Sequence, residues 1–326
     1  MDSSRPRRFI HFFAVFTAAS TLWLIFMGAL VKSHEAGLSV PDWPNTYGQF
    51  MFSFPFDMWR ANIFYEHSHR LVASFVGFLI LVQAFVLQFK TDKPYLKKLG
   101  WAALGAVILQ GVLGGLTVIF LLPTWISTSH ATLAQITLCL TTAIALITSK
   151  NWALSEEHSY DGRNYASLRK HASFVIIAIF VQLILGALMR HEEAGLAIPT
   201  FPLSNGKVIP DFVSLGVVLN FLHRSWAFVV ATLIIALNIR AYKTTVKALR
   251  TPAIIGILLV LIQISLGAIT IWSGKEPNWT SLHVVTGASV LMTEFIVFMR
   301  VRYCLCSVTQ EHADEKISFT EMATVS

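Results

Sequence analysis

Charged side chains are scarce in this chain. Asp, Glu, Lys and Arg together make up 13% of its 326 residues, whereas a soluble globular domain carries about 25%. Hydrophobic residues make up 55%, and the mean hydropathy is +0.62. The shortage of charge excludes an ordinary soluble domain and indicates a polytopic membrane protein.

The alternation of apolar and polar residues that a membrane β-barrel needs is absent as well. The chain has instead nearly uncharged runs of about 18 or more residues, the length with which a helix crosses a bilayer. Eight such runs lie roughly at 10–31, 63–89, 99–122, 128–149, 172–189, 215–239, 253–272 and 280–300. Because a helix pairs its backbone amides internally, the sequence predicts an all-α integral membrane protein with eight transmembrane helices.

Positive charge is unevenly divided between the two predicted sides of the membrane. Of the 25 lysine and arginine residues, eighteen lie on the side of the N-terminus, five lie on the opposite side, and Arg70 and Arg224 lie near helix ends. Since positive residues favour the cytoplasmic side, both termini are predicted to be cytoplasmic. The net charge of +7 follows from this topology and does not indicate nucleic-acid binding.

Cysteine is nearly absent, with three residues at Cys139, Cys304 and Cys306. All three fall in the predicted cytoplasmic half, so we expect no disulfide on the outer face. We interpret the Cys-x-Cys pair as incidental rather than as a metal site. A long Ser- and Arg-rich presequence is also missing, which favours a bacterial cytoplasmic membrane over an imported organellar protein.

The sequence contains an internal repeat. Residues 28–44, GALVKSHEAGLSVPDWP, align without a gap with 186–202, GALMRHEEAGLAIPTFP, with nine identities in seventeen positions. Further on, LQGVLGGLTV at 109–118 aligns with IQISLGAITI at 262–271. An even number of crossings keeps both copies in one orientation, so we expect two tandem four-helix bundles related as a pseudo-twofold, parallel repeat.

The repeated phrase opens a large outer loop in each half, and loops longer than about 12–15 residues tend to be functional. Prolines in both copies keep the loop from continuing as helix. The first loop is rich in aromatic residues, which fits an amphipathic cover and an aromatic belt at the membrane interface equally well. These residues are Trp43, Tyr47, Phe50, Phe52, Phe54, Phe56 and Trp59.

Four of the eleven histidines are paired by the repeat: His69 aligns with His223, and His130 aligns with His283. Each lies in the outer third of an even-numbered predicted helix, where an ionisable residue is costly and therefore indicates function. Two imidazoles from facing helices of a bundle can bind a heme iron axially. Small residues that would admit a flat macrocycle are Gly111, Gly114, Gly115, Gly267 and Ala268.

Hydrogen-bonded packing histidines and a site for another metal are the alternatives to heme ligation. Zinc is disfavoured because each half lacks a clear third protein ligand. Arg70 and Arg224 directly follow His69 and His223. An arginine there is suited to bind heme propionates by charge-assisted hydrogen bonds, or else it extends to the lipid headgroups.

The two halves differ beside the first histidine of each. Glu66 lies three residues before His69 and four before Arg70, and its counterpart in the second half is Asn220, which cannot ionise. A partly desolvated carboxylate can act as a base or stabilise positive charge. We therefore expect one site to do chemistry and the other to hold a fixed redox cofactor, unless Glu66 merely pairs with Arg70.

The two four-helix repeats, the phrase AGLSVPDWP, the motif EHSHR and the paired histidines resemble the heme A synthase family over residues 10–302. The resemblance implies oxidation of the C8 methyl group of heme O, by successive hydroxylations, to the formyl group of heme A. It implies a heme b cofactor on His223 and His283, and a heme O substrate site on His69 and His130 with Glu66 catalytic. The implied partners are heme O synthase, which is the protoheme farnesyltransferase, and cytochrome oxidase assembly.

The resemblance divides the chain into a substrate half (1–150), a cytoplasmic linker (151–170), a heme b half (171–302) and a cytoplasmic tail (303–326), with both heme sites towards the outer face. Some family members carry a cysteine pair in the first outer loop. Neither outer loop of this chain contains cysteine. An external electron acceptor, which the sequence does not identify, must therefore act without local thiols.

Two other functions account for part of these features. A diheme b-type electron-transfer cytochrome would explain the histidines and the repeat, but it leaves Glu66 unexplained. A transporter or heme-handling assembly factor would explain parallel repeats. Transporter sites, however, tend to lie near the membrane midplane on broken helices, whereas these polar residues cluster towards one face.

Overall fold

The computed structural model describes residues 4–153 and 162–323. Within these ranges, eight helices are long and apolar enough to cross a membrane, which confirms the predicted number of spans. They are α1 (Ser4–Ser33), α2 (Asn62–Lys90), α3 (Pro94–Ile119), α4 (Thr124–Ile147), α6 (Gly162–His191), α7 (Leu215–Tyr242), α8 (Lys247–Trp272) and α9 (Pro277–Ala323).

The connections contain short helices only: α5 (Lys150–Ala153), η1 (Met51–Ser53), η2 (Phe56–Met58) and η4 (Ala194–Leu196). Pairing between extended segments in the described ranges is limited to two isolated bridges, Thr46 with Gln49 and Ser204 with Lys207. The all-α class predicted from the sequence is therefore confirmed.

Each predicted run forms the body of one helix, but some helices extend well beyond their runs: α6 begins at Gly162 where residue 172 is predicted, and α9 ends at Ala323 where residue 300 is predicted. In contrast, α3 is predicted to reach residue 122 but ends at Ile119. Leu121 and Leu122 both have φ of 59°, a left-handed conformation that cannot continue a right-handed helix. At its other end α3 starts earlier than predicted, at Pro94, because proline is well suited to a first helical turn.

The four long helices of each half form a closed ring of contacts. In the N-terminal half, α1 and α3 each contact both α2 and α4, and in the C-terminal half α6 and α8 each contact both α7 and α9. This recurrence is what the sequence repeat predicts. The halves meet through α1 with α9, α4 with α6, and α4 with α9.

The central helices of the molecule are α4 and α9. Of their most apolar stretches, 61% and 44% of the residues are buried inside the protein, against 17–33% for the other six spans. The six outer helices therefore direct most of their apolar side chains outward, as expected for a multi-pass membrane protein. The two central helices carry His130 and His283.

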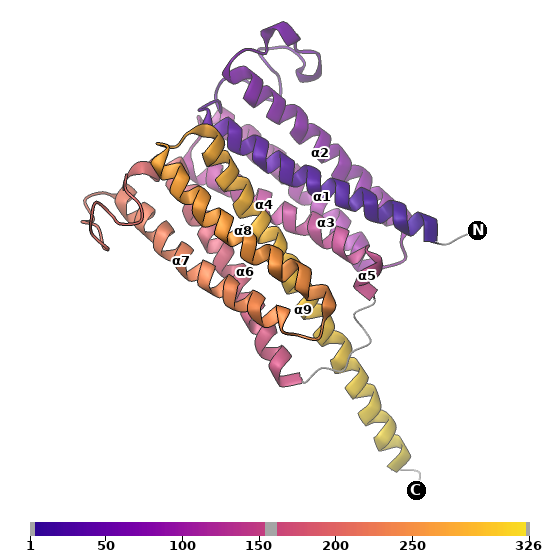
Figure 1. Ribbon diagram of the computed structural model, residues 1–326. Helices are drawn as coiled ribbons and strands as arrows, with labels where there is room; N and C mark the ends of the chain where they lie inside the picture. The colour runs from indigo at the N-terminus through magenta and orange to yellow at the C-terminus, as the bar shows by residue number, and fades with distance from the viewer. Residues whose placement is uncertain (1–3, 154–161, 324–326) are drawn as a thin grey trace.

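Both termini lie at one end of the molecule, as Figure 1 shows. The connection from α1 to α2 (residues 34–61, the first loop) and that from α6 to α7 (residues 192–214, the second loop) lie at the opposite end, which we call the loop end. The segment 303–326, predicted as a tail, continues α9 as far as Ala323. The predictions for residues 154–161 and 324–326, and for the side chains of Cys304 and Cys306, lie outside the described residues.

Candidate functional site

The four histidines paired by the repeat all lie near the loop end, close to the first turns of α2, α4, α7 and α9. In the N-terminal half, His69 on α2 and His130 on α4 pack against α1 and α3, the two helices that contact both α2 and α4. His223 on α7 and His283 on α9 are related to α6 and α8 in the same way. The fold thus places both members of each predicted pair at the same end of one four-helix ring.

Each of these imidazoles packs against a glycine of the preceding long helix. A Cβ atom on Gly28, Gly114, Gly186 or Gly267 would lie 3.2, 3.1, 2.9 or 3.2 Å from Cε1 of His69, His130, His223 or His283, respectively. Such distances are too short for an ordinary carbon contact, so a larger residue would displace the ring. Gly114 and Gly267 are among the predicted small residues. Gly28 and Gly186 are not, although both open the repeated phrase.

The chemistry of the histidine pairs fits axial ligation of a heme iron. Nδ1 of His69, His130 and His283 is buried without a hydrogen-bond partner. Within the described ranges, no group of three or more His, Cys, Asp and Glu residues could hold a metal ion. A heme iron needs only two ligands from the protein, because the macrocycle supplies the others. The glycine contacts give each imidazole a fixed place on its helix.

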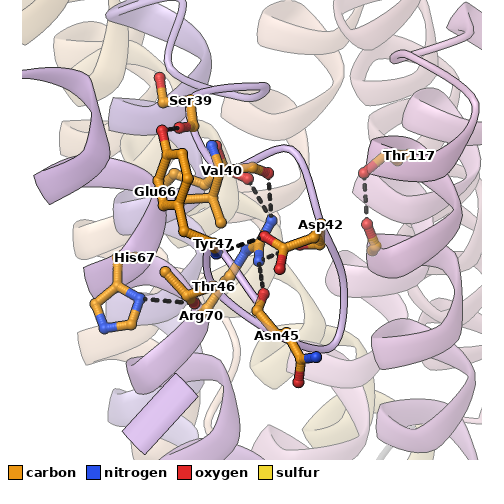
Figure 2. Close-up of polar contacts among 11 residues, drawn as sticks. Ser39, Val40, Asp42, Asn45, Thr46, Tyr47, Glu66, His67, Arg70 and Thr117 are labelled. Carbon is orange, nitrogen blue, oxygen red and sulfur yellow. Dashed lines mark hydrogen bonds and ion pairs between the residues drawn. The ribbon is translucent and has the colours of Figure 1, made fainter. Parts of the chain in front are cut away.

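Glu66 and Arg70 fasten the first loop to α2 (Figure 2). The Arg70 guanidinium donates to the carbonyl oxygens of Val40, Asp42 and Asn45, at 2.7–3.0 Å, and to Oε1 of Glu66 at 2.7 Å. Oε2 of Glu66 accepts the backbone N–H of Val40 at 2.8 Å. Both side chains are buried. The ion pair that the sequence left as an alternative role for Glu66 is present, and it holds the loop in place.

The second half repeats the arginine contacts but not the acidic one. Arg224 donates to the carbonyl oxygens of Ile198 and Thr200, the counterparts of Val40 and Asp42, at 2.6 Å each. Asn220 is buried, and its amide donates to the carbonyl oxygens of Ala194 and Gly195 at 2.9 Å. Both arginines thus bind loop backbone, and a propionate contact for either one remains a prediction.

The first loop folds back over the N-terminal half. Asp42 accepts N–H bonds from Tyr47 and Gly48, at 2.8 and 2.7 Å. Burial alone would raise the pKa of Asp42, but these two bonds and the charge of Arg70 outweigh it, so the pKa is lowered. Beyond this turn, the Trp43 ring lies where a Cβ on Gly115 would be, 2.5 Å from that position. Trp43 therefore covers α3 directly beside Gly114, which packs on His130.

His67, which the sequence offers no reason to select, belongs to the packing of this loop. Its Nδ1 lies 3.3 Å from the Thr46 hydroxyl, and its ring contacts Phe54 and Trp59. Of the aromatic residues in the first loop, Phe54 is buried and Trp59 half-buried, and Trp43 packs on α3 although it stays 42% exposed. Tyr47, Phe50, Phe52 and Phe56 are exposed, so the loop has both the covering and the interfacial character that its composition allows.

The halves are joined at the loop end by polar contacts that sequence reasoning does not select. Arg190, at the end of α6, donates to Ala29 O and Ser33 Oγ of α1 at 2.8 and 2.7 Å. Ser281 of α9 donates to Ser33 as well. Lys32, the repeat counterpart of Arg190, pairs with Glu193. The repeat alignment could have singled out these two cations, because both close the first helix of their half.

The C-terminal half also contains a buried acid, Glu294, that the sequence patterns do not select. Oε1 of Glu294 on α9 accepts from the Asn238 side chain of α7 at 2.7 Å, with no exposure of either residue. Gly256 of α8 leaves room for them, since a Cβ there would lie 2.2 Å from Glu294. By its place on α7 and α9, this pair lies away from the histidines, towards the end with the termini.

These features define a class: a helical, multi-pass membrane protein with two half-buried histidine pairs whose chemistry fits axial heme ligation, one of them one turn from a buried carboxylate. A family model described as cytochrome oxidase assembly protein matches residues 11–295. The chain belongs to that family.

Curated relatives agree over most of the chain. It is 26% identical over 314 residues to heme A synthase of Pelagibacter ubique, covering 85% of this chain and 92% of the relative. It is 30% identical over 263 residues to heme A synthase of Shouchella clausii, covering 78% and 83%. Heme A synthase of Brucella anthropi is 28% identical over 309 residues, with coverage of 82% and 85%.

Proposed function

We propose that this protein is a heme A synthase, an oxidoreductase that converts the C8 methyl group of heme O to the formyl group of heme A by successive hydroxylations. The observation that carries the proposal is that a carboxylate lies one turn from the first histidine of one pair only. Glu66 lies one turn from His69, whereas its counterpart beside His223 is Asn220. The names of the curated relatives support the same activity.

We assign heme b to His223 and His283, where it would supply one-electron transfer when bound. The rings of both residues pack against glycines, Gly186 and Gly267. Nothing beside this pair ionises in the place of Glu66, since Asn220 is engaged with loop carbonyls. This arrangement suits a cofactor that is held and not modified.

We assign the substrate heme O to His69 and His130. The first loop would exclude water from this site, because Trp43 lies against α3 and Arg70 and Glu66 hold the loop backbone. Glu66 would stabilise positive charge that develops at the substrate, or accept a proton, as a carboxylate in a partly dry site can do. Its fixed hydrogen bonds keep the carboxylate in one position during the reaction.

We place the protein in a bacterial cytoplasmic membrane, with both termini cytoplasmic and the histidine pairs towards the outer face. The excess of lysine and arginine on the side of the termini supports this orientation. Heme O synthase would provide the substrate, cytochrome oxidase assembly would receive the product, and an electron acceptor outside the chain would complete the oxidation.

The test is extraction and chromatography of heme from cells that express heme O synthase with or without this protein. Heme A that appears only with the protein is the expected result. The symmetry of the glycine and histidine contacts favours a second candidate, a diheme b-type electron-transfer cytochrome. That function predicts no heme A and two b-type hemes per chain.

A further inference from the structure

Three of the four histidines have a glutamine side chain against them. Nε2 of Gln110 lies 3.3 Å from Nε2 of His130 and donates to the carbonyl oxygen of the same histidine at 2.9 Å. Nε2 of Gln182 lies 3.2 and 3.3 Å from the two ring nitrogens of His223 and donates to its carbonyl oxygen at 3.1 Å. Nε2 of Gln263 lies 3.4 Å from Nε2 of His283.

The fourth histidine, His69, has leucine where the repeat predicts glutamine. Gly28 aligns with Gly186, so Leu24, one turn before Gly28, is the counterpart of Gln182. Leu24 packs, partly buried, on the apolar core of the N-terminal half. Nδ1 of His69 is buried without a hydrogen-bond partner. His69 is therefore packed by its glycine like the others, but no carboxamide takes the place of Gln182 beside it.

A glutamine in this place can fix an imidazole in either protonation form. Its carboxamide has both donor and acceptor atoms. Nε2 is the atom of Gln110, Gln182 and Gln263 that lies against the imidazole, and Oε1 of each is buried without a partner. A half-turn of the carboxamide would place Oε1, an acceptor, where Nε2 lies. Hydrogen bonds to a ligating imidazole orient the ring and raise its basicity, and their loss typically lowers metal affinity by about 10–100-fold.

We propose that the exchange of Gln182 for Leu24 decides which half keeps its heme and which half releases it. Gln182 acts as a positioning residue that holds His223 as a firm ligand, and Leu24 leaves His69 as the ligand that gives way. The inference rests on the proposed function, which takes the two histidine pairs as axial ligands and assigns the N-terminal pair to the substrate. A substrate must enter and leave, whereas a cofactor must stay, and the single missing carboxamide lies in the predicted substrate half.

The test uses reciprocal variants of the full-length purified protein, Gln182→Leu and Leu24→Gln, each loaded with heme b. The measurement is the rate of heme transfer to excess apomyoglobin, followed by absorbance. Gln182→Leu should speed heme loss from the C-terminal half by about 10–100-fold. Leu24→Gln should slow loss from the N-terminal half by a similar factor. Leu24→Gln should also lower the midpoint reduction potential of the heme in the N-terminal half, because a more basic imidazole favours ferric iron.

Methionine variants separate the carboxamide from side-chain volume. Gln182→Met should behave like Gln182→Leu, and Leu24→Met should behave like the wild type. They also keep the test informative should Gln182→Leu fail to fold. Transfer rates and potentials that are equal in the wild type and in both reciprocal variants would overturn the inference.

The failure of the inference can be told from failure of the proposed function. A wild-type protein that shows no low-spin heme spectrum, or keeps the same spectrum in His223→Ala, would refute axial ligation itself and the inference with it. Low-spin heme that depends on His223 but leaves at unchanged rates in both variants would refute the inference alone.

Discussion

The two halves hold their loops with the same arginine but with opposite polar partners one turn earlier. Arg70 and Arg224 donate to equivalent carbonyl oxygens of the first and second loops. Glu66, however, accepts an N–H from its loop, whereas Asn220 donates to carbonyl oxygens of the other loop. The first loop therefore presents a backbone N–H group to this position of the helix, whereas the second loop presents carbonyl oxygens.

A duplicated bundle can diverge at single side chains while the contacts that position its histidines are kept. The glycine contacts of the four histidines are kept in both halves, since they determine where each ring lies. The residues that differ include Glu66 against Asn220, and the apolar Leu24 against the polar Gln182. We propose that a few such changes let one half bind a reactant and the other retain a cofactor.

Removing the negative charge of Glu66 should have the largest effect. In Glu66→Gln, the amide oxygen can still accept the Val40 N–H, but the side chain can no longer neutralise Arg70. We expect heme A formation to fall by about 100-fold or more, with heme b content unchanged. Product chromatography and the reduced heme spectrum are the measurements.

Glu35→Gln is the matched control, because Glu35 is an exposed acid of the same loop. It should leave product formation unchanged. A normal heme A yield from Glu66→Gln would reduce Glu66 to a residue that only holds the loop.

Replacing either arginine with alanine should have the next largest effect, and the loss of stability should differ between the two halves. Arg70→Ala leaves a buried carboxylate unpaired, which costs about 3–5 kcal/mol, whereas Arg224→Ala removes two hydrogen bonds to carbonyl oxygens and leaves no charge behind. We expect Arg70→Ala to lower the unfolding temperature more and to expose the first loop to protease in reconstituted vesicles.

The double variant Glu66→Gln with Arg70→Ala should recover part of the lost stability, because no buried charge remains unpaired. A loss of stability in the double variant that equals the sum of the losses in the two single variants would contradict the coupling between these side chains.

A methyl group on the glycines should have a smaller effect that differs between the halves. Gly186→Ala places a Cβ 2.9 Å from His223, and Gly28→Ala places one 3.2 Å from His69. Overpacking of this kind costs about 1–3 kcal/mol, so we expect reduced heme content, more in Gly186→Ala. Gly111→Ala, with nothing within 4 Å of its added Cβ, is the control. Equal heme content in all three variants would argue against these contacts.

Lowering the pH should have the smallest effect, through protonation of Glu193 at the junction of the two halves. Burial acts to raise the pKa of Glu193, but Lys32 and Lys275 outweigh it and hold the pKa below the ordinary value of 4.5. A carboxylate with a lowered folded-state pKa stabilises the protein above its unfolded-state pKa, and this contribution is lost as the pH falls through the folded-state value.

Because Glu193 is more than half exposed, we expect its ion pairs to contribute less than about 1 kcal/mol. Unfolding temperatures of the wild type and Glu193→Gln, measured from pH 6 to below pH 4.5, should converge at the acid end. A constant difference between the two proteins across that range would contradict the assignment.

Composition and repetition were sufficient to predict the spans and the histidine pairs. Hydrophobic length fixes the helices, and the repeat selects His69, His130, His223 and His283 from eleven histidines. The aligned segments pair Gln110 with Gln263, and Leu24 and Gln182 lie at equal distances before Gly28 and Gly186. Which glutamines touch imidazoles, however, depends on how neighbouring helices rotate.

Other contacts could not be read from the sequence because nothing in the repeat marks them. Glu294 has no acidic counterpart, and its partner Asn238 lies 56 residues away on another helix. The carbonyl oxygens that Arg70 binds depend on the folded path of the first loop, which side-chain patterns do not specify. Backbone partners of this kind emerge only in three dimensions.

If the C-terminal half retains a cofactor while the N-terminal half handles a substrate, the two histidine pairs should fail differently. The amount and kind of heme bound to two purified double variants, His69→Ala/His130→Ala and His223→Ala/His283→Ala, tests this division. We expect the first variant to keep one heme b per chain but to form no heme A, and the second to lose its heme b. Retention of heme b by the second variant, or heme A formation by the first, would refute the division of roles between the halves.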